Sequence, residues 1–285
     1  EEIWGVAGTG NLWFQVYMWP DKDLSMQQIK RIKSVGFETL IITVDGPVGS
    51  NREYNKKNGF SMPLKYSYKL FAQLLARPGW LVRVLGQHYL RRGAPTMVNY
   101  PDELISRITD PMLKHMHTKT DNLTWEHVMR IRDNWPGNLL IKGLQSAEDA
   151  LIAKNKGLDG VILSNHGGRY VDCAPAPLQV LSETRALVGG DFTVIIDSGA
   201  RRGSDLVKAI ALGANLVMSG RPTLWGAAVA GTKGSFRALE IFYNEMDRVM
   251  AQLGLNSIEE IGPQIFWNPP DWAVPSKQLL RLAAE

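Results

Sequence analysis

The feature that most constrains the fold is a unit that occurs three times: a helical pattern, a glycine, and a short apolar run that ends in polar residues. The three copies read SMQQIKRIKSVGFETLIITVD, SAEDALIAKNKGLDGVILSNH and GSDLVKAIALGANLVMSGR. We expect each helix to begin at a serine N-cap and to stop at a glycine in the left-handed conformation. The serines are Ser25, Ser146 and Ser204, and the glycines are Gly36, Gly157 and Gly213. The apolar runs are too continuous for strands with one wet face, so they predict a parallel sheet that helices cover.

Three further apolar runs bring the number of expected strands to six. The strands are expected over residues 12–18, 39–44, 139–142, 160–164, 193–197 and 215–219. Polar residues recur where they end, among them Thr43, Lys142 and Asp197. In a (β/α)8 barrel all strands end on the face that carries the active site, whereas the ligand of a doubly wound sheet gathers at one switch point. Chemistry at every strand end therefore favours a TIM (β/α)8 barrel, with the doubly wound sheet as the alternative.

The composition excludes several other classes of protein. Hydrophobic residues make up 45% and charged residues 21% of the 285, which is typical of a globular chain and not of a disordered or coiled-coil one. The lone Cys173 excludes a disulfide framework and a cysteine-rich metal cluster, and we expect no metal site. The sequence has no apolar run of the roughly 18 residues that a membrane span needs, and we expect no signal peptide. Together these features indicate a cytoplasmic protein.

Positive charge is concentrated in residues 54–101, which we term the basic insertion. It has no acidic residue and eight basic ones: Lys56, Lys57, Lys65, Lys69, Arg77, Arg83, Arg91 and Arg92. The rest of the chain has 24 basic and 28 acidic residues, which excludes a protein that coats nucleic acid. Because the insertion also contains the apolar stretch LFAQLLARPGWLVRVL, it is typical of a segment that binds an anionic membrane surface. An ordinary lid or an oligomer contact is the alternative.

The motif SNHGGR, residues 164–169, has the composition of a catalytic turn. A histidine such as His166 can act as a general base, and Arg169 offers a planar fork that fits a carboxylate. Asp45 lies at the same offset from its glycine as His166, and it is placed to orient the imidazole or to stabilise its charge. The alternatives are a solvated turn for the motif and an Asx-turn for Asp45, which precedes Gly46 and Pro47.

Two glycine-rich loops, residues 197–204 and 219–222, follow the last two strands. Together with their arginines and the start of a helix they match the common phosphate site of a barrel, although a surface helix with incidental arginines is the alternative. Lys142 ends a buried strand, where an unpaired ammonium is costly, so we expect it to meet an anion. Gln15 and Tyr17 point to one side of the first strand, an arrangement that by itself is more often packing than chemistry.

The motifs LWFQVYM, TVDGPVGSNRE, LLIKG, SNHGGR, DSGARRGSD and SGRP stand in one order along the chain. In that order they resemble the FMN-dependent L-2-hydroxy acid dehydrogenase/oxidase family, with details that lean toward its mandelate and lactate dehydrogenases. The resemblance implies an FMN-binding (β/α)8 barrel domain over residues 1–285, and an enzyme that oxidises an L-2-hydroxy acid to the 2-keto acid. It also implies a homotetramer, an electron acceptor that is a quinone of the respiratory chain or O2, and a peripheral position on the inner face of the cell membrane.

The resemblance also implies a role for each candidate residue. His166 resembles the catalytic base, Asp45 its carboxylate partner, and Tyr17 the tyrosine at the substrate's oxygen. Arg52 and Arg169 resemble the two arginines that hold the substrate carboxylate. The residues that match flavin-contacting positions are Gln15, Thr43, Lys142, Ser164, Asp197, Ser198, Gly199, Arg201, Gly220 and Arg221.

Two departures from the family pattern affect these expectations. Tyr170 and Val171 replace the usual Gln-Leu pair beside the substrate pocket, which predicts a different pocket shape. Family members also begin with a further stretch that carries the first two barrel strands, so we expect only strands 3–8 here. A related FMN-dependent isomerase and an inactive or partner-binding partial barrel are the alternative functions.

Overall fold

The computed structural model describes residues 3, 5, 11–60, 63–65, 67–97, 99–100, 105–110, 123–269 and 271–275. Parts of the basic insertion, including its last residue, Pro101, lie outside these residues. The chain forms two compact units. We call them the sheet unit, residues 1–17, 37–45 and 125–285, and the insertion unit, residues 18–36 and 46–124.

The sheet unit is built on six parallel strands, each of which overlaps one of the predicted ranges. They are β1 (Trp13–Tyr17), β2 (Thr39–Thr43), β3 (Asn138–Leu144), β4 (Gly160–Leu163), β5 (Thr193–Ile196) and β6 (Leu216–Val217). Their order in the sheet is the order in the chain, and every pair is parallel. A doubly wound sheet reverses its order at a switch point, so the unbroken order excludes that alternative and fits successive strands of a (β/α)8 barrel.

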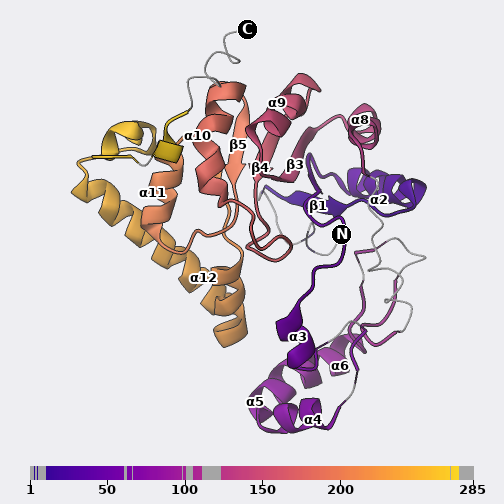
Figure 1. Cartoon of the computed structure of the whole chain (residues 1–285). Helices are drawn as coiled ribbons and strands as arrows, with labels where there is room; N and C mark the ends of the chain where they lie inside the picture. The colour runs from indigo at the N-terminus through magenta and orange to yellow at the C-terminus, as the bar shows by residue number, and fades with distance from the viewer. Residues whose placement is uncertain are drawn as a thin grey trace. The chain divides into compact units, whose positions relative to one another are not determined.

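Helices follow the strands as the repeated unit predicts (Figure 1). They are α8 (Trp125–Asn134), α9 (Ala147–Asn155), α10 (Pro177–Val188), α11 (Gly203–Ala211) and α12 (Arg221–Gln252), with 3-10 turns at Ile258–Glu260, Pro263–Ile265 and Asp271–Ala273. Helix α9 packs on β3 and β4, and α10 packs on β4 and β5. Helix α12 is interrupted at Ala230 and Gly231, whose backbone angles are not helical.

The core of the sheet unit explains why the strands read as uninterrupted apolar runs. All residues of β2 and β4 are buried, so both faces of these strands are covered. Ile41, Leu140, Ile162 and Ile195, from four successive strands, form one cluster against which Met218 packs. The pairing of β3 with β4 shifts register between Lys142 and Leu144, which leaves Gly143 in a bulge.

The insertion unit contains α2 (Lys22–Val35), α3 (Glu53–Lys57), α4 (Tyr68–Leu75), α5 (Pro78–Trp80), a π-helical turn (Leu81–Gly86) and α6 (Gln87–Arg92). No residue of α3, α4, α5, the π-helical turn or α6 is buried. In the described part of the chain, no helix combines the length and the apolar character that crossing a membrane requires.

The predicted helix ends are right for the glycines and wrong for two serines. Gly36, Gly157 and Gly213 all have positive φ, and Ser146 accepts a hydrogen bond from the backbone N–H of Asp149. Ser25 is not an N-cap, because α2 begins earlier and the Asp21 carboxylate accepts the free N–H groups of Asp23 and Leu24. Ser204 is not an N-cap either, because it lies inside α11, where the Asp205 carboxylate accepts from the N–H groups of Arg201 and Arg202.

Arg185, near the end of α10, joins three segments of the sheet unit. Its guanidinium donates to the carbonyl oxygens of Gly213 and Phe192, at 2.8 Å each, and to the side chain of Asn215 at 2.5 Å. The Asn215 oxygen in turn accepts from the N–H of Val194 in β5. Burial lowers the pKa of the Arg185 guanidinium. Its contacts therefore satisfy carbonyl groups that would otherwise lack donors.

We expect Arg185→Ala to lower the free energy of unfolding by about 2 kcal/mol, because it leaves several partly buried acceptors without a donor. Urea denaturation followed by circular dichroism measures the effect. Arg237→Ala is the matched control, since its exposed guanidinium pairs with Glu240 one turn away, and it should change stability by less than about 0.5 kcal/mol. Equal effects of the two substitutions would contradict this account of Arg185.

Candidate active site

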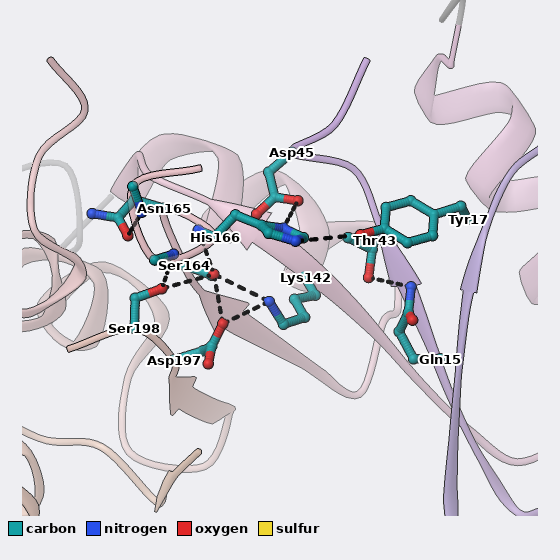
Figure 2. A network of polar contacts seen from close by, with 12 residues as sticks. Gln15, Tyr17, Thr43, Asp45, Lys142, Ser164, Asn165, His166, Asp197 and Ser198 are labelled. Carbon is teal, nitrogen blue, oxygen red and sulfur yellow. Dashed lines mark hydrogen bonds and ion pairs between the residues drawn. The ribbon is translucent and has the colours of Figure 1, made fainter. Parts of the chain in front are cut away.

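The polar side chains predicted at the strand ends gather on one side of the sheet (Figure 2). They come from β1, from the end of β2, from β3, and from the turns that follow β4 and β5. Because the strands are parallel and in sequence order, their carboxyl ends meet at one edge, and residues far apart in the chain become neighbours. All of these residues belong to the sheet unit.

His166 is held by two side chains from other strands. Its Nδ1 lies 2.9 Å from Oδ1 of Asp45, and its Nε2 lies 3.5 Å from the hydroxyl oxygen of Tyr17. The Asp45 side chain is only 3% exposed, and its second oxygen, Oδ2, is buried and has no hydrogen-bond partner among the described residues. Since a carboxylate only accepts, the neutral imidazole donates from Nδ1 and keeps the lone pair of Nε2 for a proton. The buried carboxylate of Asp45 thus fixes the tautomer of His166, and this is an arrangement in which Nε2 can act as a general base.

Lys142 meets an anion, as predicted, and that anion is Asp197. The ammonium lies 2.7 Å from Oδ2 of Asp197 and 3.1 Å from the hydroxyl of Ser164, which itself donates to Asp197 at 2.7 Å. Burial by itself would raise the pKa of Asp197, but the hydrogen bond and charge of Lys142, with hydrogen bonds from Ser164 and the Ser198 backbone, hold it below its usual value. Asp197 is therefore a carboxylate at neutral pH, and Lys142 carries its counter-charge.

The turns after β4 and β5 are joined by a hydrogen bond, and each contains a residue whose backbone conformation is rare for residues other than glycine. His166 and Ser198 have φ angles of 54° and 84°, the only positive values among the described non-glycine residues. The hydroxyl of Ser198 accepts from the N–H of Gly167 at 2.9 Å, and that of Ser164 accepts from the N–H of His166 at 3.0 Å. Strained backbone that is fixed by surrounding contacts is concentrated at functional sites in proteins. Here it sets the direction of the His166 ring.

A pocket of about 620 Å³ extends from the base to the glycine-rich loops. Its lining includes Lys142, His166, Gly167, Arg169, Asp197, Ser198, Gly199, Ala200, Arg201, Met218, Ser219, Gly220 and Arg221. Arg221 donates to the carbonyl oxygen of Gly167 at 2.6 Å, and the hydroxyl oxygen of Ser219 is buried without a hydrogen-bond partner. The lining thus combines a histidine and several cations with open glycine backbone. An anionic ligand fits such a lining.

Gln15 and Thr43 lie in this group and are joined by a hydrogen bond of 2.8 Å beside Tyr17 (Figure 2). One predicted residue is not in the group. Arg52 belongs to the insertion unit, where its guanidinium donates to the hydroxyl of Ser50, and its substrate-binding role stays a prediction. In the described part of the chain, no group of three His, Cys, Asp or Glu side chains is arranged to hold a metal ion.

Two residues near His166 make contacts that the sequence did not predict. The ring of Tyr170 stands edge-on to the ring of His166, with 4.8 Å between centroids, so it restricts the imidazole from a third direction. Its aromatic type four residues after the histidine was the available signal. Gly143, in the β3 bulge, lies against Asp45, and only the pairing of strands reveals that contact.

Comparison with known proteins places this site in a family context. The family described as FMN-dependent dehydrogenase matches residues 1–268. The chain is 38% identical over 259 residues to (S)-mandelate dehydrogenase of Pseudomonas putida, and 35% identical over 258 residues to a putative L-lactate dehydrogenase of Mycobacterium tuberculosis. These alignments cover 91% and 90% of this chain but only 64% and 59% of the two relatives. The chain thus spans less than two thirds of their length.

A solved structure gives the same result. The crystal structure described as the monotopic membrane protein (S)-mandelate dehydrogenase is 37% identical and superposes with a TM-score of 0.82. The match covers 94% of this chain and 70% of that one. The six parallel strands and their helices therefore have the arrangement found in that protein.

Proposed function

Because the chain belongs to the FMN-dependent dehydrogenase family, we propose that the protein oxidises an L-2-hydroxy acid, mandelate-like or lactate-like, to the 2-keto acid. The observation that carries this proposal is the buried Asp45 against Nδ1 of His166, with Arg169 lining the same pocket. A base and a carboxylate-binding arginine beside an anion pocket are the groups that such a substrate requires.

The pocket lining fits FMN, which supplies a two-electron acceptor when it is bound. Lys142, Arg201 and Arg221 provide positive charge for its phosphate and its ring. At Gly199 and Gly220 the space beside the backbone is open, so phosphate oxygens can approach the amide N–H groups. Among the described residues the buried hydroxyl of Ser219 has no hydrogen-bond partner, and bound FMN can provide one. We propose that the remaining contacts come from Gln15, Thr43, Ser164, Asp197 and Ser198.

In the proposed reaction the substrate loses two electrons and two protons: one proton goes to His166, and the electrons and the other proton go to FMN when it is bound. Arg169 and Arg52 bind the substrate carboxylate and orient its hydroxyl-bearing carbon. His166 accepts a proton at Nε2, and Asp45 stabilises the imidazolium that results. Tyr17, whose hydroxyl lies beside Nε2, is placed to contact the oxygen of the substrate.

Anaerobic bleaching of the flavin tests this function. The purified protein should carry flavin absorbance, and (S)-mandelate or L-lactate should bleach it without oxygen, whereas the opposite enantiomers should not. A flavoprotein that no L-2-hydroxy acid bleaches would instead support the isomerase, and a protein without flavin would support the partner-binding barrel. Reoxidation by O2 compared with a quinone then identifies the acceptor, and light scattering tests the proposed homotetramer.

We also propose that the basic insertion binds an anionic membrane surface at the inner face of the cell membrane. Its helices expose large apolar side chains, including Tyr68 at 97%, Leu90 at 89% and Val82 at 65%. Exposed cations adjoin them in the chain, with Arg83 directly after Val82 and Arg91 directly after Leu90. Apolar side chains that enter the interface together with cations that meet anionic headgroups are the two components of peripheral membrane binding. The related (S)-mandelate dehydrogenase is described as a monotopic membrane protein.

We expect the protein to float with vesicles that contain anionic lipid at low salt, and to float less as salt rises. The double variant Arg83→Gln/Arg91→Gln should bind about thirtyfold more weakly, since each basic residue contributes about 1 kcal/mol near such a surface. Arg83→Lys/Arg91→Lys keeps the charge and is the matched control. Absence of flotation at low salt would contradict membrane binding.

A further inference from the structure

We propose that Gly143 is a positioning residue for the catalytic base, because the absence of a side chain at this position lets the Asp45 carboxylate reach His166. The inference rests on the proposed function, in which the pair of Asp45 and His166 takes the substrate proton. It adds a residue of β3 that does not touch the base itself.

The backbone around Gly143 is fixed by the β3 bulge. The register of β3 against β4 shifts between Lys142 and Leu144, and Gly143 has a φ of 107°, in the region that favours glycine. Bulges re-aim neighbouring side chains and are frequent next to active sites. On the other side, the N–H of Val44 donates to the carbonyl oxygen of Lys142 at 2.9 Å, which ties the bulge to the residue that precedes Asp45.

A side chain at position 143 would meet Asp45 directly. A Cβ built there would lie 2.5 Å from Cβ of Asp45, 2.6 Å from its Cγ and 2.8 Å from its backbone nitrogen. All three distances are too short, and the buried Asp45 side chain, at 3% exposed, has no solvent into which it can retreat. An alanine at 143 therefore displaces the carboxylate, and the 2.9 Å contact with Nδ1 of His166 is the interaction that it changes.

The competing explanation is that glycine serves only the backbone of the bulge. Gly157, at the end of α9, separates the two explanations. It also has positive φ, at 75°, but a Cβ there would meet nothing within 4 Å. Gly157→Ala therefore places a side chain at a positive φ, as Gly143→Ala does, but without the contact to Asp45.

The test compares these two variants in the full-length, flavin-containing protein. The first readout is the downfield proton resonance of the His166 Nδ1–H bonded to a carboxylate, assigned by its loss in His166→Gln. The second is turnover of the L-2-hydroxy acid that bleaches the flavin. We expect Gly143→Ala to shift or remove the resonance and to lower turnover by about 10²-fold, the effect of a misplacement of about 1 Å. Gly157→Ala should keep both.

A wild-type resonance in Gly143→Ala would overturn the proposal, whatever the turnover. If no 2-hydroxy acid is turned over at all, the proposed function fails, but the resonance still decides the role of Gly143. A second measurement applies if Gly143→Ala folds poorly. Asp45→Gly removes two of the three short contacts, so Gly143→Ala should lower the melting temperature less in that background than alone. An equal loss in both backgrounds would also overturn the proposal.

Discussion

His166→Gln is expected to lower the rate of flavin reduction by the best 2-hydroxy acid by about 10²–10⁴-fold, the usual contribution of a general base. Glutamine has similar reach, but its amide cannot take a proton at neutral pH. The contact between Nδ1 and Asp45 identifies Nε2 as the basic atom, so the loss should appear in the chemical step rather than in substrate binding. Anaerobic stopped-flow measurement of flavin bleaching provides the rate.

The control for this substitution is His88→Gln, which makes the same chemical change in α6 of the insertion unit. It should leave flavin reduction unchanged. Flavin absorbance of the His166→Gln protein must first match that of the wild type, so that the rate reports chemistry and not cofactor loss. Near-wild-type reduction by every active substrate in a flavin-replete His166→Gln protein would remove His166 from the mechanism.

The second large effect is expected at the Lys142–Asp197 ion pair. Its two side chains are only 12% and 19% exposed, and the charged atoms lie 2.7 Å apart. Asp197→Asn removes one charge and leaves the ammonium without its partner, which should lower the free energy of unfolding by about 3 kcal/mol. Urea denaturation of flavin-free protein measures this, because bound cofactor would add its own stabilisation. The double variant Lys142→Met/Asp197→Leu should lose less, since it leaves no isolated charge; an equal or greater loss would contradict the ion-pair explanation.

The same ion pair makes the folded protein less stable as the pH falls. The pKa of Asp197 is lower in the folded protein than in the unfolded chain, where an aspartate titrates near about 3.9. Its contribution to stability is therefore complete above that unfolded value and is lost as the pH falls through the lower folded value. Below about pH 4, the unfolding free energy should therefore fall less steeply with falling pH in Asp197→Asn than in the wild type, which urea denaturation at a series of pH values measures.

The sequence predicted the sheet well because local signals determined it. Each strand carried its own apolar run, and each repeated helix ended at a glycine whose positive φ no other residue adopts as easily. The starts of helices were less certain, because several polar residues competed for one cap. Asp21, and not Ser25, is the N-cap of α2, and its carboxylate accepts two backbone N–H groups. The hydroxyl of Ser146, the N-cap of α9, accepts only one.

One contact of the candidate site was predicted from the sequence, and the others were not. Asp45 and His166 were paired by their equal offsets from a glycine, and the structure places them 2.9 Å apart. The need of Lys142 for an anion was also evident from its buried strand, but its partner is 55 residues away and could be found only after the strands were paired. The contacts of Gly143 and Tyr170 were missed for the same reason, since a bulge and a ring contact depend on tertiary structure.

The long chain separations within the site also bear on how the protein reaches its working state. Tyr17 and Asp45 contact His166 across 149 and 121 residues of chain, and neither contact can form until strands far apart in the sequence have joined one sheet. Such non-local pairing is the slow part of folding, because loop closure precedes any gain from the contacts. Helical structure should therefore return early after dilution from denaturant, and catalytic competence should return last. Recovery of the proposed activity should therefore report when the sheet is complete.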